Sequence, residues 1–258
     1  GDIVYTYGPH AGYFKINITD RWHGVCVKVP DGLAPDVASF THMAGIAMTA
    51  IRVSDIELGD KVAVTGLGAI GILAGQLARL QGAMVLGTDP EEFRRKLALE
   101  CGIDVVINPL KMNPVEEVRR ITGGEGVTTL IEASGNPAAL QSMLDAVALN
   151  GEVILLGSPR NPYETNLTEP LRHFHILPWN HSLKGALEFI FPTQPIPFAK
   201  HSIERNAGII MNLMKEGKLN IDPIYTHRLS PFHAAKAYEG LRNKKDEFVG
   251  VVFDWSQV

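Results

Sequence analysis

Cysteine and long apolar runs are both scarce in this sequence. Only two cysteines, Cys26 and Cys101, occur among 258 residues, and their spacing suggests neither a metal site nor a disulfide framework. A reducing cytoplasm is therefore the simplest expected location. No apolar stretch is long enough to span a bilayer, and the first residues lack the charged-then-apolar pattern of a signal peptide.

An excess of charge of one sign is absent as well. The chain has 24 basic and 28 acidic residues, a net charge of −4. This balance indicates neither a nucleic-acid partner nor an acidic membrane surface, so we expect neither. The length allows a large core in one or two domains.

The most informative stretch lies between residues 61 and 95. A β-branched run, 61–65, predicts a buried strand, and the motif Gly66-Leu67-Gly68-Ala69-Ile70-Gly71 follows it directly. Helical spacing then leads to a second strand, 84–88, which is followed by Asp89. This order of strand, glycine turn, helix, strand and acid is typical of dinucleotide binding.

Each part of this motif has a chemical reason. Gly66 permits a tight turn, Gly68 lets the backbone approach a pyrophosphate, and Gly71 lets the helix pack on the strand. N–H groups at the helix start, around Ala69 and Ile70, bind the anion with the help of the helix dipole. A lone motif of this kind can also be a turn that merely packs, but the elements around it favour cofactor binding.

The acid after the second strand bears on the choice of cofactor. Asp89 lies 18 residues after Gly71, where a ribose-binding carboxylate is expected, and it repels the 2′-phosphate of NADP. Arg94 and Arg95 lie one turn further on and can reach either the ribose or a 2′-phosphate. NAD is the preferred cofactor, with NADP as the alternative.

Strands and helices alternate cleanly from 61 to 157, which predicts a doubly wound parallel sheet covered by helices on both faces. Right-handed crossovers place the carboxyl ends of all its strands at one edge, where ligands bind. Besides the glycine turn and Asp89, that edge receives Ser134, Gly135, Gly157 and Ser158, which are the remaining candidate cofactor-binding residues.

The flanking regions have a different pattern. Strands are expected there at 3–7, 13–18, 25–29, 182–189 and 249–253, and helices at 35–58, 204–217 and 231–242. Within the alternating region, a helix is expected at 137–149.

Several segments together resemble the medium-chain dehydrogenase/reductase superfamily, the zinc-type alcohol and polyol dehydrogenases. They are the glycine turn with Asp89, Thr49-Ala50-Ile51 before Leu58-Gly59-Asp60-Lys61-Val62, Gly217-Lys218-Leu219-Asn220-Ile221-Asp222-Pro223, Thr226-His227-Arg228-Leu229, and Ala234-Ala235-Lys236-Ala237-Tyr238. The resemblance covers nearly the whole chain.

The resemblance implies an α/β fold in which a Rossmann domain is inserted into a mostly β, GroES-like catalytic domain. Residues 1–40 would end the first part of the catalytic domain, 41–188 would be the NAD-binding domain, and 189–258 would be the return of the catalytic domain. Gly1-Asp2-Ile3-Val4 matches a strand that relatives have well inside their first domain, so we expect the preceding portion to be lacking.

The resemblance also implies a catalytic zinc, whose first two ligands in the family precede the segment that matches Gly1. The third falls near Phe40-Thr41-His42, where no cysteine stands. His42 is the candidate metal ligand because imidazole suits zinc. The favoured interpretation is nevertheless that His42 packs or caps a helix.

Three further histidines are an alternative metal cluster. His173 and His175 share a face only if they lie on a strand, with His181 nearby. The neighbouring aromatic residues favour subunit packing instead.

The sequence thus predicts an NAD-dependent oxidoreductase that transfers hydride between a secondary alcohol, polyol or sugar-like, and NAD, with zinc assistance in the complete protein. The partner would be a small alcohol or ketone, and the family suggests a homodimer or homotetramer. The catalytic residues are not identified. Two alternatives stay open: an NAD-binding fragment without catalysis, and a zinc-independent NADPH reductase.

Overall fold

A computed structural model describes residues 1–20 and 23–258. The chain forms two compact units, one of residues 46–186 and the other of residues 1–45 and 187–258. The division falls within α2 (Thr41–Val53).

The unit of residues 46–186 is built on a six-stranded sheet in the order β5-β4-β3-β6-β7-β8, and every pair of neighbours is parallel. The strands are β3 (Lys61–Thr65), β4 (Met84–Thr88), β5 (Val105–Ile107), β6 (Val127–Glu132), β7 (Val147–Leu155) and β8 (Ser182–Gly185). This is the doubly wound order, which reverses between β3 and β6. The expected Rossmann sheet is confirmed.

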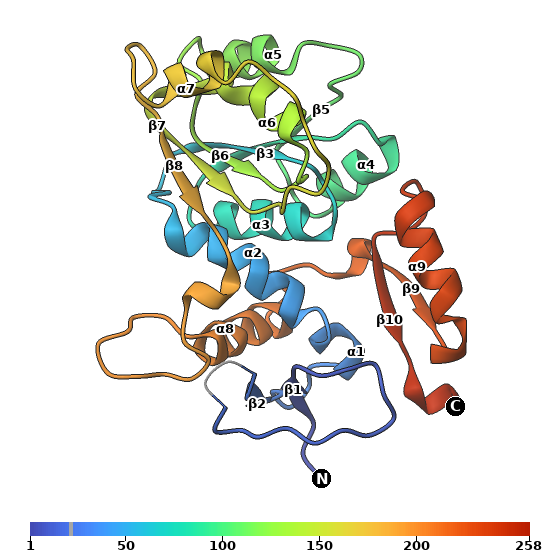
Figure 1. Ribbon diagram of the computed structural model, residues 1–258. Helices are drawn as coiled ribbons and strands as arrows, with labels where there is room; N and C mark the ends of the chain where they lie inside the picture. The colour runs from blue at the N-terminus through green and yellow to red at the C-terminus, as the bar shows by residue number, and fades with distance from the viewer. Residues whose placement is uncertain (21–22) are drawn as a thin grey trace. The chain divides into compact units, whose positions relative to one another are not determined.

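Helices cover both faces of this sheet (Figure 1), as buried parallel strands require. The helices of the unit, after α2, are α3 (Ala69–Leu80), α4 (Glu92–Glu100), α5 (Pro114–Ile121), α6 (Pro137–Met143) and α7 (Thr168–His173). α3 contacts β3 and β4, and α5 and α6 lie on the opposite face. The core on that face includes fully buried Leu130, Val118 and Met143.

One helix of this unit is shorter than the sequence suggests. The helix expected to run to residue 149 ends at Met143, and the chain passes through a single 3₁₀ turn, Leu144–Ala146, into β7. Val147 already pairs with Val127 of β6, and the register shifts before Thr129 pairs with Glu152. Strand pairing thus overrides the helical preference of the apolar residues before Gly151.

The unit of residues 1–45 and 187–258 combines two short strand pairs with helices. β1 (Val4–Thr6) pairs antiparallel with β2 (Cys26–Lys28), and β9 (Tyr225–Leu229) pairs parallel with β10 (Gly250–Phe253). The helices are α1 (Pro35–Ala38), α8 (Ile203–Lys215) and α9 (Ala234–Asn243). The assignment of this unit to a GroES-like domain stays a prediction.

Two predictions in this unit are wrong. The strand expected at residues 13–18 does not form, since this segment pairs with no strand of the described chain and Tyr13 is 99% exposed. The single helix expected at 35–58 is two helices, because the helical repeat is interrupted at Ser39 and Phe40 between α1 and α2.

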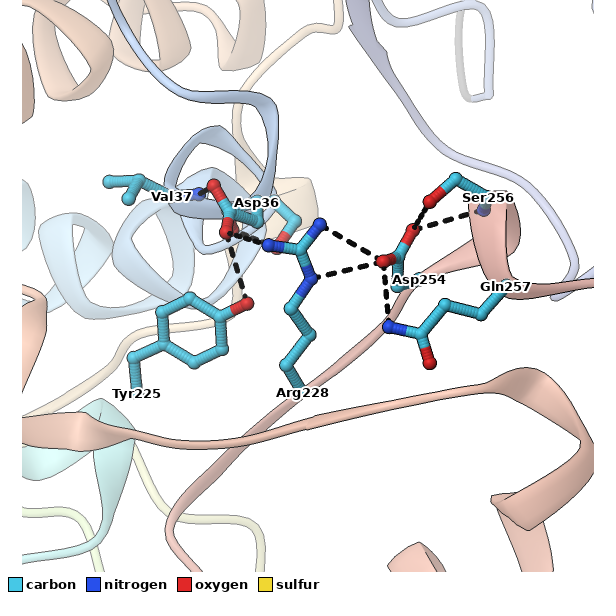
Figure 2. A network of polar contacts seen from close by, with 8 residues as sticks. Asp36, Val37, Tyr225, Arg228, Asp254, Ser256 and Gln257 are labelled. Atoms are coloured by element: carbon cyan, nitrogen blue, oxygen red, sulfur yellow. Dashed lines mark hydrogen bonds and ion pairs between the residues drawn. The ribbon is translucent and has the colours of Figure 1, made fainter.

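An ion-pair network joins three segments of this unit (Figure 2). The guanidinium group of Arg228 lies 3.4 Å from Asp36 Oδ2 and 2.9 Å from Asp254 Oδ2. Tyr225 Oη also donates a hydrogen bond to Asp36, at 3.1 Å. Because Arg228 is half exposed, this network orients β9 and β10 more than it stabilises them.

No helix among residues 1–20 and 23–258 combines the length and apolar character needed to cross a bilayer.

Candidate functional site

The glycine turn between β3 and α3 requires glycine for steric reasons at both ends. Gly66 has a φ of +91°, and a Cβ added there would lie 2.8 Å from Ser134 Cα. A Cβ on Gly71 would lie 1.9 Å from the carbonyl oxygen of Gly66. The backbone of the turn therefore closes onto both the start of the helix and the end of β6.

Gly68 lies in a more open environment than Gly66 and Gly71, the other two glycines of the motif. It is the N-cap residue of α3, in extended conformation, and the nearest atom to an added Cβ is Arg94 Nη1 at 3.9 Å. Gly68, Ala69 and Ile70 are partly exposed, whereas Gly71 is buried. The first N–H groups of a helix have no partner within it, so the start of α3 can bind an anion.

Asp89 ties the glycine turn to the start of the next helix. Its carboxylate is 4% exposed, and Oδ2 accepts a hydrogen bond from Leu67 N while Oδ1 accepts one from Glu91 N, both at 2.8 Å. Each carboxylate oxygen keeps a second lone pair for a ligand. Asp89 thus positions the turn in addition to offering acceptors beside it.

The two neighbouring arginines, which the sequence leaves equivalent, differ in the structure. Arg95 Nη1 donates to the carbonyl oxygens of Asp89 and Pro90, at 2.6 and 2.7 Å, and so stabilises the chain itself. Arg94 Nη1 lies 3.9 Å from Asp89 Oδ2, and its Nε is buried without a hydrogen-bond partner in the described chain. Arg94 is therefore the arginine available to a ligand beside Gly68.

Sequence reasoning missed Glu132, the last residue of β6. Its side chain is buried, and Oε1 accepts hydrogen bonds from Ser134 N at 2.8 Å and Gly135 N at 3.1 Å, as well as from Ser134 Oγ. The N–H groups of Ser134 and Gly135 therefore face Glu132 rather than a cofactor. The available signal was an acid ending a buried strand, directly before a turn rich in N–H donors.

The remaining candidate residues, Gly157 and Ser158, lie against the turn that follows β6. A Cβ on Gly157 would lie 2.4 Å from Gly135 N, and one on Gly135 would lie 2.4 Å from the carbonyl oxygen of Ser158. Together with the contact between Gly66 and Ser134, these approaches bring the ends of β3, β6 and β7 to one place at the sheet edge.

His42 belongs to the other unit and lies near the start of α2. Its ring packs edge-on against Tyr7, with ring centroids 4.5 Å apart, and Nδ1 lies 3.7 Å from Glu188 Oε2. Tyr7 Oη donates to the same carboxylate oxygen at 2.9 Å. Tyr7 and His42 also line a hollow of about 750 Å³ within this unit.

Burial alters the acid–base properties of this group. It raises the pKa of Glu188 to about 7, although the hydrogen bond from Tyr7 acts in the opposite direction. Burial also lowers the pKa of His42 and is the main cause of the raised pKa of Tyr7. No local sequence pattern indicates this group, because Glu188 lies 181 positions from Tyr7.

These residues do not form a zinc site by themselves. His42 Nδ1 is buried and has no hydrogen-bond partner within residues 1–20 and 23–258, as expected of a metal-binding nitrogen without its metal, and Glu188 lies beside it. Yet no group of three His, Cys, Asp or Glu side chains in the described chain is arranged to hold a metal, and structural or catalytic zinc needs at least three protein ligands. The role of His42 as a ligand stays a prediction.

The histidine cluster is also not arranged as a strand would place it. His173 ends α7, so His173 and His175 do not alternate on a strand, and both ring nitrogens of His173 have partners, Glu169 O and Asp145 Oδ1. Burial and the neighbouring His173 lower the pKa of His181 to about 4. Trp179 packs on His173, with ring centroids 4.6 Å apart, which makes this an aromatic cluster.

Comparison with known proteins adds independent information. The family described as zinc-binding dehydrogenase matches residues 69–189. An L-threonine 3-dehydrogenase of Pyrococcus furiosus is 32% identical over 245 residues, which are 94% of this chain and 64% of that protein. A D-guloside 3-dehydrogenase of Escherichia coli is 37% identical over 236 residues, which are 90% of this chain and 65% of that protein. The chain thus spans just under two thirds of the length of these curated relatives.

The fold agrees with this relationship. An alcohol dehydrogenase from Thermus sp. superposes with a TM-score of 0.68 at 26% identity, over 88% of this chain and 60% of that one. The similarity extends well beyond the glycine turn, which many unrelated dinucleotide-binding proteins share. In sequence and fold, the chain is thus similar to zinc-binding dehydrogenases of the medium-chain type over the part of their length that it spans.

Proposed function

We propose that this chain binds NAD at the carboxyl edge of its parallel sheet. There it would take part in hydride transfer between NAD and a secondary alcohol of the polyol or sugar type. The observation that carries the proposal is the glycine turn from Gly66 to Gly71, held by Asp89 at the point where the strand order reverses. Dinucleotides bind across this crevice in doubly wound sheets. The relatives named for L-threonine and for a guloside support a hydroxylated substrate.

The roles of the residues follow from their places. The start of α3, around Gly68, Ala69 and Ile70, would bind the pyrophosphate. Asp89 would accept from the adenosine ribose, and Arg94, 3.9 Å from it, would contact the same sugar. Ser134, Gly135, Gly157 and Ser158 would form the floor of the other half of the crevice through their backbone.

Cofactor preference follows from the pair Asp89 and Arg94. A carboxylate beside the ribose disfavours a 2′-phosphate, whereas Arg94 would favour one. Because Asp89 is held by two backbone N–H groups, it stays in place whichever cofactor approaches, and this supports NAD. Zinc assistance and a dimeric or tetrameric assembly stay predictions from the family and enter no step here.

The experiment is a calorimetric titration of the purified chain with NAD⁺ and NADP⁺, comparing wild type with Gly68→Asp. A Cβ added at Gly68 would meet no atom of the described chain closer than 3.9 Å, so the variant should fold while its carboxylate repels the pyrophosphate. We expect NAD⁺ to bind more tightly than NADP⁺, and Gly68→Asp to weaken NAD⁺ binding by about tenfold or more, equivalent to 1.4 kcal/mol. Gly208→Asp is the matched control, because Gly208 also has open space around it but lies in α8.

The result also separates the alternatives. Absence of NAD⁺ binding by wild type would refute the proposal, and tighter binding of NADP⁺ would favour the NADPH-dependent reductase. Binding of NAD⁺ without any reduction in the presence of secondary alcohols would favour a binding module. Unchanged affinity in Gly68→Asp would show that the cofactor binds elsewhere.

A further inference from the structure

Glu132 is a buried carboxylate at the centre of the candidate cofactor site. It ends β6 and is 2% exposed. Its Oε1 accepts from Ser134 N, Ser134 Oγ and Gly135 N, and its Oε2 would lie 2.9 Å from a Cβ on Gly157. The turn after β6 therefore wraps around this carboxylate.

Glu132 differs from the other buried strand carboxylate of this sheet in having no cation beside it. Glu152 is 5% exposed and lies 2.8 Å from Lys184 Nζ. None of the ion pairs found among residues 1–20 and 23–258 includes Glu132, and the donors to its carboxylate are neutral N–H and O–H groups. A buried charge without a counterion exerts its field over a longer distance than a paired one.

The position of Glu132 in the sheet indicates which part of the cofactor would feel this field. The half of the sheet formed by β3, β4 and β5 carries Asp89 and corresponds to the adenosine side. β6 opens the other half, beyond the reversal of strand order, so its carboxyl end lies on the nicotinamide side. The turn that Glu132 holds also touches the glycine turn, since a Cβ on Gly66 would lie 2.8 Å from Ser134 Cα.

We propose that Glu132 determines the preference of the site for the oxidation state of the cofactor, by stabilising bound NAD⁺ relative to NADH. The nicotinamide ring of NAD⁺ carries a positive charge, which disappears when the ring accepts a hydride. A carboxylate near this ring therefore stabilises the oxidised form and contributes little to binding of the reduced form. This inference rests on the proposed function, because it requires the dinucleotide to bind at this edge.

The test measures the affinities of NAD⁺ and NADH for wild type and for Glu132→Gln. Glutamine keeps the length and shape of the side chain and one oxygen acceptor while removing the charge. We expect the ratio of the NADH to the NAD⁺ dissociation constant to fall about tenfold, with most of the change in NAD⁺ binding. An unchanged ratio, in a variant that binds both forms, would overturn the inference.

Two further variants separate charge from structure. Glu152→Gln removes a buried carboxylate from the same sheet, at a residue that pairs with Thr129, about 10 Å along β6 from Glu132. This variant should lose stability and leave the ratio unchanged. Glu132→Asp keeps the charge and should keep the ratio within about threefold of wild type. If the ratio of dissociation constants fell as far in Glu152→Gln as in Glu132→Gln, a specific role for Glu132 would be refuted.

A measurement on wild type alone covers the case in which Glu132→Gln does not fold. Benzamide adenine dinucleotide has a planar, neutral ring in place of the cationic nicotinamide. We expect NAD⁺ to bind about tenfold more tightly than this isostere, and equal affinities would overturn the inference. If none of the dinucleotides binds to wild type, the proposed function itself fails and this inference fails with it.

Discussion

Replacement of Gly71 by alanine tests the packing of α3 against the glycine turn. A Cβ at this position would lie 1.9 Å from the carbonyl oxygen of Gly66 and 3.3 Å from Ala133 Cβ. The first of these is a backbone atom, so no side-chain rotation can relieve the contact. The start of α3 and the turn must move apart.

The size of the effect follows from this distance. Ordinary contact begins at 3.4 Å, so the Cβ and the oxygen must separate by about 1.5 Å more. Overpacking a core costs about 1–3 kcal/mol, and we expect the upper end because both partners belong to the main chain. At about 2–4 °C per kcal/mol, the melting temperature of this unit should fall by roughly 6–12 °C.

The assay compares three glycine-to-alanine variants by urea unfolding and by NAD⁺ titration. At Gly75, in the same helix, the added Cβ would lie 2.4 Å from Ile103 Cδ1, a side-chain end that can rotate away, so we expect a loss of about 1 kcal/mol or less. At Gly208 in α8 the Cβ meets nothing within 4 Å, so helix propensity alone predicts a gain of about 0.5–1 kcal/mol. Only Gly71→Ala should abolish NAD⁺ binding.

The order of stability of the three variants tests whether the close contact at Gly71 requires glycine. If Gly71→Ala unfolds at the same urea concentration as Gly75→Ala and still binds NAD⁺, the close contact between the helix and the turn is not what requires glycine. The reasoning that connects this glycine to the shape of the cofactor site would then be wrong.

Three further predictions concern single side chains. Burial raises the pKa of Glu188 from 4.5 to about 7, so the folded chain holds a proton that the unfolded chain releases, and the unfolding free energy should fall as pH rises between these values. This decrease should amount to at most about 3 kcal/mol, and Glu188→Gln should remove it. The measurement is urea unfolding of wild type and Glu188→Gln across this pH range, and equal pH profiles would contradict the raised pKa of Glu188. Asn113→Ala removes the hydrogen bond from Val115 N to Oδ1 that caps α5 and should cost about 1 kcal/mol in urea unfolding; a loss below about 0.3 kcal/mol would show that water replaces the cap. Arg228→Met should lower the melting temperature slightly at low salt and not at high salt, because its ion pairs are exposed; a loss that persists in high salt would indicate packing instead.

The parallel sheet and its edge could be predicted from the sequence because their determinants are local. Glycine spacing, β-branched runs and caps such as Asn113 act over a few residues, and right-handed crossovers then fix which strand ends meet. The approach of Gly66 to Ser134, and of Gly135 to Ser158, follows from this topology alone.

The remaining features depend on contacts for which the sequence has no local pattern. The hydrogen bond between Tyr7 and Glu188 joins residues 181 positions apart, and only folding brings them together. The start of β7 at Val147 depends on its pairing with β6. This pairing overrides the helical preference of the segment before Gly151. Long-range pairing and tertiary burial, rather than propensity, decide such positions.

The two carboxylates at the crevice support a common interpretation of the site. Asp89 and Glu132 each follow or end a central strand, and each accepts hydrogen bonds from backbone N–H groups of the adjoining turns. They differ in their surroundings, because Arg94 lies 3.9 Å from Asp89 whereas Glu132 has no cation among the described residues. A dinucleotide is itself asymmetric, with a neutral adenosine at one end and a ring that changes charge at the other. In the proposed binding mode, the Glu132 carboxylate on the nicotinamide side would respond to that change in charge, whereas Asp89, beside Arg94, would position a ribose.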